Sequence, residues 1–271
     1  MKIEIWSDVV CPWCYIGKRR LEHALAGFEH AGDVEITWRS FQLNPEFPRG
    51  EAIPTTEYLT QRFGPQASGM TSRVVDIARD EGLDLDYSRA LAVNTFDAHR
   101  LLHLGADLGV AGAVKERLLR GHFTDGANLA DPDTLVNLMK EAGADPDRAR
   151  AVLDGDEYSD DIQADITQAR AFGATGVPFF VIDRKYGISG AQPTETFLHA
   201  LRTAWASLSN ERLWLDHPLL CHDRGDEVGG GYVERVVDGS GSGRRGGHGY
   251  LFVRAALDGY ARSGRRVRVD G

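Results

Sequence analysis

The feature that most constrains this chain is a pair of cysteines at the junction between a strand pattern and a helix pattern. Ile3 and Ile5 alternate with polar residues, which predicts a half-buried strand that ends just before the pair. Apolar residues at three- and four-residue spacing, from Trp13 to about Phe28, predict a helix after it. Alternation returns over residues 34–38. Strand, helix and strand in this order open an α/β unit, so we expect an α/β fold.

The middle of the chain has the pattern of a helical block. Asp131 and Asp145 each precede a proline, which is typical of a helix N-cap followed by the first helical residue, and the strand pattern disappears. Strand character returns over 179–182 and 186–188, and a final helix is predicted over 193–205. The expected organisation is the first half of one domain (residues 1–50), a helical insertion (51–170), the second half of that domain (171–207) and a tail (208–271).

Charge and composition argue against two classes of binding partner, nucleic acids and membranes. The net charge is -9 and the pI is near 5.5, whereas a phosphate-binding protein normally has a basic face, so we expect no nucleic-acid partner. No apolar run approaches the ~20 residues that span a bilayer, and the N-terminus lacks the apolar segment of a signal peptide. We therefore expect no membrane partner and a cytoplasmic location.

The tail differs in composition from the rest of the chain. Glycine is frequent in residues 208–271, lysine is absent, and the stretch 240–247 has no apolar residue to bury. This composition predicts disorder rather than a packed element.

The spacing and position of Cys11 and Cys14 indicate redox chemistry. Unpaired backbone amides and the helix dipole at a helix N-terminus stabilise a thiolate, which is the attacking species in disulfide exchange. Pro12 fits the first turn because its missing N–H is not needed there. The alternatives are a zinc half-site and an inert pair. The remaining cysteine, Cys221, lies in the tail beside His222, and we expect no metal site.

The residues around the cysteines resemble a known family. Similar segments occur in order along residues 1–206, namely Ser7 to Gly17, Phe41 to Pro45, Asn94 to Arg100, Gly176 to Phe180 and Ser189 to Gln192. They resemble FrnE-like proteins, a DsbA-related group of the thioredoxin superfamily. The resemblance implies a thioredoxin-like fold with a large helical insertion, with Cys11 as nucleophile and Cys14 as resolving thiol. It also implies a cis bond between Val177 and Pro178 facing the cysteines, and it is compatible with a homodimer.

The resemblance also suggests residues of a substrate site. These are Pro12, Trp13, Asn44, His99, Val177 and Pro178. Trp13 stands where DsbA has His, so a cation that could stabilise the thiolate is missing and we predict a less oxidising pair than that of DsbA. Asn44 matches a glutathione-contacting position of kappa-class transferases, but it also has the pattern of a turn residue before proline. His99 could move protons or could pack within a helix.

Disulfide exchange needs no cofactor beyond the cysteines, with glutathione or another low-molecular-weight thiol as a co-substrate. The expected partners are protein or small-molecule thiols and disulfides. One alternative is a thiol-dependent isomerase of an aromatic or polyketide-type molecule, similar to 2-hydroxychromene-2-carboxylate isomerase. Those relatives have Ser at the position of Cys11 and an acidic residue near residues 190–192, where none stands here. A non-catalytic, chaperone-like role is the other alternative.

Overall fold

The protein is built around one four-stranded mixed sheet. The computed structural model describes residues 1–216, with side chains to residue 208. The strands are β1 (Lys2–Ser7), β2 (Glu35–Ser40), β5 (Phe179–Ile182) and β6 (Tyr186–Ser189), in the order β2-β1-β5-β6. β1 is parallel to β2 and antiparallel to β5, with Ile5 opposite both Trp38 and Phe180. The two ends of the described chain are thus joined in one sheet, which confirms the predicted α/β fold.

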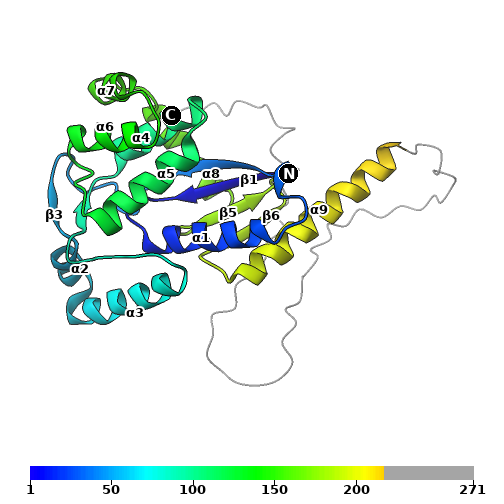
Figure 1. Cartoon of the computed structure of the whole chain (residues 1–271), viewed down its shortest axis with the longest axis horizontal. Coiled ribbons are helices and arrows are strands. Elements are labelled where there is room, and N and C mark those ends of the chain that lie inside the picture. The colour runs from blue at the N-terminus through cyan, green and yellow to red at the C-terminus, as the bar shows by residue number, and fades with distance from the viewer. Residues whose placement is uncertain (217–271) are drawn as a thin grey trace, which may run out of the picture.

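Helices cover both faces of this sheet. Figure 1 shows α1 (Pro12–Ala26) and α9 (Thr194–Asp216) side by side beneath the strands. Ile3 and Ile5 pack with these two helices, whereas Trp6 on the opposite face packs with Ala169 of α8 (Ser159–Ala171). Neighbouring residues of a strand point to opposite faces, so β1 supplies both cores.

The burial of Glu4 corrects the prediction of a half-buried first strand. Because α8 covers the second face, Glu4 is only 1% exposed, although the alternation predicted a solvated position. Its carboxylate accepts hydrogen bonds from Arg39, at 2.7 Å, and from Arg184, at 3.0 Å. Burial alone would raise the pKa of Glu4, but these two guanidinium groups outweigh it and hold the pKa below its usual value.

Most of the chain between β2 and β5 is helical. The elements are β3 (Ala52–Pro54), α2 (Thr55–Phe63), α3 (Ala67–Asp80), β4 (Leu91–Val93), α4 (Phe96–Asp107), α5 (Ala111–Arg120), a π-helical turn η3 (Gly121–Asp125), α6 (Pro132–Glu141) and α7 (Pro146–Asp154), with 3₁₀ turns η1 (Ala31–Asp33) and η2 (Gly64–Gln66). Asp131 and Asp145 are N-caps whose carboxylates accept from Thr134 and Asp147, as predicted. The pairing of β3 with β4 was not predicted, because three residues are too few to show alternation.

Two further expectations concern the tail and membrane-spanning helices. The predicted tail, 208–271, lies outside the described residues except for the last turns of α9. Within residues 1–216, no helix has both the length and the apolar content needed to cross a bilayer.

Gly17 allows α1 to approach the loop before β5. A Cβ at this position would lie 3.0 Å from Cγ of Pro178 and 3.2 Å from Cζ of Phe180. We predict that Gly17→Ala lowers the free energy of unfolding by about 1–3 kcal/mol, because the helix and the proline loop must separate. Gly69→Ala in α3 is the control, since nothing lies within 4 Å of its Cβ. Chemical denaturation of both variants tests this; equal stability of the two would contradict it.

Candidate active site

The two cysteines occupy the start of α1, at the end of the sheet where β1 stops. Cys11 is the N-cap residue with extended backbone angles, Pro12 is the first helical residue, and the Cys14 amide donates to the Cys11 carbonyl at 3.0 Å. Both thiols are free. Cys11 is 3% exposed but lines a cavity, whereas Cys14 is 1% exposed and lies behind it. A substrate that enters the cavity therefore meets Cys11 first.

A cis peptide bond faces the first cysteine. The Val177–Pro178 bond is cis, as the resemblance implied. Sγ of Cys11 lies 3.6 Å from the Val177 carbonyl oxygen, to which it donates. The Pro178 carbonyl accepts from the amide of Gly190 at 2.8 Å, which anchors the loop to the segment after β6.

The environment shifts the pKa values of the two thiols in opposite directions. The pKa of Cys11 is well above its usual value, first because its thiol is hydrogen-bonded to Cys14 and second because it is buried. Burial would also raise the pKa of Cys14, but the hydrogen bond with Cys11 and the charge of Lys115 outweigh it and lower that pKa. The sequence pattern predicted a lowered pKa for Cys11. The structure differs because the buried cation Lys115 acts on Cys14 and lowers the pKa of that thiol instead.

A buried polar cluster lies behind the cysteines. Asp8 is fully buried and accepts hydrogen bonds from the amides of Val9 and Leu43, both at 2.7 Å. Nε2 of His99 lies 3.2 Å from the same carboxylate. Burial would raise the pKa of Asp8, but these contacts lower it, led by the one with His99. The carboxylate thus ties the start of α1 to the segment after β2 and to α4.

Lys115 completes this cluster from the helical block. It belongs to α5, its relative exposure is 0%, and its ammonium lies 5.6 Å from the centre of the Trp38 ring. Burial lowers its pKa to about 8, although the negative charges of Cys14 and Asp8 act in the opposite direction. Sequence analysis missed Lys115, because a lysine on an amphipathic helix normally faces solvent.

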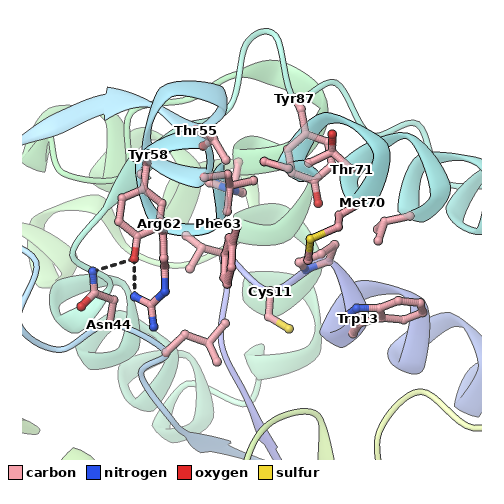
Figure 2. A pocket seen from close by; sticks show the side chains of 18 of the residues that line it. Cys11, Trp13, Asn44, Thr55, Tyr58, Arg62, Phe63, Met70, Thr71 and Tyr87 are labelled. Atoms are coloured by element: carbon pink, nitrogen blue, oxygen red, sulfur yellow. Dashed lines mark hydrogen bonds between the residues drawn. The ribbon is translucent and has the colours of Figure 1, made fainter. Parts of the chain in front are cut away.

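The cavity in front of Cys11 is largely apolar and measures about 390 Å³ (Figure 2). Its walls come from the start of α1, the segment after β2, the elements from α2 to α3, and the loop that contains Val177. Large apolar side chains that are 37–50% exposed stand among the lining residues. They are Trp13, Leu43, Phe63 and Met70. Their exposure gives the cavity an apolar rim.

One part of the cavity wall is polar and positively charged. The Tyr58 hydroxyl accepts a hydrogen bond from Asn44 at 3.0 Å and from Arg62 at 2.8 Å, as the dashed lines of Figure 2 show. Within residues 1–208, no carboxylate forms an ion pair with Arg62. The charge of this guanidinium is therefore available to an anionic group that enters the cavity.

The structure brings most of the predicted substrate-site residues together. Pro12, Trp13, Asn44 and Val177 line the cavity, and Pro178 adjoins it through the cis bond. Asn44 also begins a turn, since its carbonyl accepts from Phe47 at 3.3 Å, which agrees with its turn pattern. Its contact with glutathione stays a prediction.

His99 is placed differently from the other five. It is fully buried against Asp8 and is not among the lining residues, so the structure puts it behind the cysteines rather than in the cavity.

Among residues 1–216, no three His, Cys, Asp or Glu side chains are grouped as metal ligands.

His122, which sequence analysis missed, lines the cavity from the π-helical turn. It is 2% exposed, and burial lowers its pKa to about 4 from the usual 6.5. In the unfolded chain, His122 therefore takes up a proton below pH ~6.5, whereas in the folded protein it does so only below pH ~4. The free energy of unfolding is thus lost as the pH falls through this window. We predict that wild type loses about 2 kcal/mol more than His122→Phe between pH 7 and pH 5. Urea unfolding at both pH values tests this, and parallel losses would contradict it.

Comparisons with known proteins agree with this geometry. Residues 2–202 match the family described as DSBA-like thioredoxin domain. YwbO, an uncharacterized protein of Bacillus subtilis (strain 168), is 26% identical over 204 residues, which cover 73% of this chain and 94% of that protein. A probable DsbA oxidoreductase from Streptomyces coelicolor is 44% identical, with a TM-score of 0.73 over 76% of this chain and 90% of that structure.

A more distant structure shares the fold alone. A 2-hydroxychromene-2-carboxylate isomerase is 15% identical, with a TM-score of 0.54 over 79% of this chain and 99% of that structure. The expected thioredoxin-like fold with inserted helices is thereby confirmed, and this chain belongs to the family of DsbA-like thioredoxin domains.

Proposed function

We propose that this protein is a thiol-disulfide oxidoreductase in which Cys11 exchanges disulfides with substrate and Cys14 resolves the mixed disulfide. The observation that carries the proposal is the unequal access of two adjacent free thiols. Cys11 lines the cavity beside the Val177 carbonyl, whereas Cys14 lies one helical turn behind it. A substrate disulfide thus reaches only one sulfur, and the other is poised to attack from within.

The exchange balances in two steps. Cys11 attacks a substrate disulfide as a thiolate once its proton has passed along the hydrogen bond to Cys14. A bond between Cys11 and one substrate sulfur forms, and the other substrate sulfur leaves and takes up that proton. Cys14 then attacks Sγ of Cys11, the internal disulfide forms, and the second substrate sulfur leaves. Two electrons pass from the cysteines to the substrate, and the reverse sequence oxidises a dithiol. Which direction operates depends on the potential of the pair against its surroundings.

The cavity supports substrates that present an apolar group beside the sulfur. Trp13, Phe63 and Met70 offer apolar surface around Cys11, and Arg62 offers a charge that a carboxylate would satisfy. Glutathione or another low-molecular-weight thiol is proposed as the co-substrate, and the cytoplasm as the compartment. No further cofactor is required by this chemistry.

Replacing the resolving thiol tests the proposal. We expect Cys14→Ser to accumulate a mixed disulfide at Cys11 and to lose turnover by on the order of 100-fold, because the internal displacement is missing. Non-reducing mass spectrometry with a small aromatic disulfide measures the adduct, and Cys11→Ser is the matched control that should form none at this site. A thiol-dependent isomerase needs only one thiol, so unchanged turnover by Cys14→Ser would reject exchange in favour of that alternative.

The role of Arg62 generates a separate prediction about substrate charge. Arg62→Met should lower kcat/KM about tenfold for a disulfide that carries a carboxylate, because a charge-assisted hydrogen bond is lost. An uncharged disulfide of the same size should react as before. Arg73→Met, on the exposed side of α3 and outside the cavity lining, is the control. Equal losses for both disulfides would contradict charge recognition by Arg62.

A further inference from the structure

Lys115 is an unusual residue for a protein interior. Its relative exposure is 0%, and within the described part of the chain its ammonium has no hydrogen-bond partner. A buried ammonium without hydrogen bonds opposes folding, so packing alone gives no reason for a lysine here. The ammonium lies 5.6 Å from the centre of the Trp38 ring.

The residue after Lys115 joins α5 to the first turns of α1, where Cys14 lies. The next residue, Glu116, accepts from the Tyr15 hydroxyl at 2.8 Å and from Arg19 at 2.9 Å, and it also binds Lys18. These contacts hold the two helices together beside the first turn of α1. The charged and titratable groups that act on the Lys115 ammonium are Cys14, Asp8, Cys11 and Lys18, with Cys14 the strongest of the anions.

We infer that Lys115 is a positioning residue whose ammonium keeps Cys14 in its thiolate form for the resolving step. This inference rests on the disulfide exchange proposed above and assigns a residue of the helical block to it. Lys115 acts through Cys14, since Lys115 is fully buried and does not line the cavity.

The need for this charge is greatest in the mixed disulfide. Once Cys11 is bonded to the substrate sulfur, it has no proton to donate and its hydrogen bond to Cys14 is lost. Lys115 is then the cation that stabilises the Cys14 thiolate. Cys14 attacks Sγ of Cys11, the bond from Cys11 to the substrate breaks, and its electron pair leaves on the substrate sulfur. Cys14 becomes neutral, while the negative charge of Asp8 continues to act on Lys115.

The test uses the full chain with Cys221 replaced by Ser, so that only the active-site thiols titrate. In the Cys11→Ala background, Lys115→Met should raise the pKa of Cys14 by at least about 1, measured by the ultraviolet absorbance of the thiolate. Lys140→Met, an exposed lysine on α6, is the matched control and should leave it unchanged. Superimposable titrations of the two variants would overturn the inference.

The resolving rate supplies a readout that a structural role would not move. With both active-site cysteines present, release of the second thiolate from a chromogenic disulfide reports the attack by Cys14. If Lys115→Met raises the pKa of Cys14 by about 1, this step should be about threefold slower at pH values below that pKa, because less thiolate is present. At pH values above it, the step should be about threefold faster, because nucleophilicity grows with basicity. The profiles of Lys115→Met and wild type should therefore cross. A uniform loss at every pH would contradict the inference.

A measurement on the unmutated protein covers the case in which Lys115→Met does not fold. By reciprocity, the pKa of Lys115 should be higher in the reduced protein than in the disulfide form, because a thiolate can form at Cys14 only in the reduced protein. Carbon-13 NMR of labelled lysine can follow it, since the chain has five lysines. An unchanged pKa would overturn the inference. Failure to form the internal disulfide at all would instead reject the proposed function.

Discussion

The antiparallel pairing of β1 with β5 is the constraint on which the site depends. It joins residues near the start of the chain to residues beyond the helical block, with Trp6 opposite Phe179. β1 leads into the cysteines and β5 follows the Val177–Pro178 bond, so this register brings a carbonyl against Sγ of Cys11. Gly17 permits the close approach because it has no Cβ to meet Pro178. The register of the sheet therefore determines where the redox pair lies relative to the loop that faces it.

Several charged and titratable groups are buried together around the start of α1. Asp8, Lys115 and the thiols of Cys11 and Cys14 are all buried. Electrostatic interactions are stronger away from water, so each of these groups shifts the pKa of the others. The helical block contributes one of these charges from α5 and forms much of the cavity wall. It therefore shapes both the chemistry and the substrate site.

Sequence analysis could predict those features that depend on local pattern. Strand and helix periodicity gave β1, α1, β2, β5 and β6 close to their observed bounds, and Asp-Pro pairs gave two helix starts. The cis bond at Pro178 came from family resemblance. Lys115 and His122 could not be predicted, because their burial depends on which helix faces pack together. Glu4 was misjudged for the same reason, since a second covering helix is invisible in the strand's own pattern.

The proposed exchange requires that Cys11 and Cys14 form one reversible disulfide. Titration of the Cys221→Ser chain against glutathione redox buffers, with thiol alkylation and mass measurement, tests it most directly. We predict a single two-electron transition between dithiol and internal disulfide, with a midpoint below the ~-120 mV of DsbA because Trp13 supplies no cation. Absence of the internal disulfide across the whole range would contradict the proposed exchange, and a midpoint at or above that of DsbA would contradict the predicted effect of Trp13.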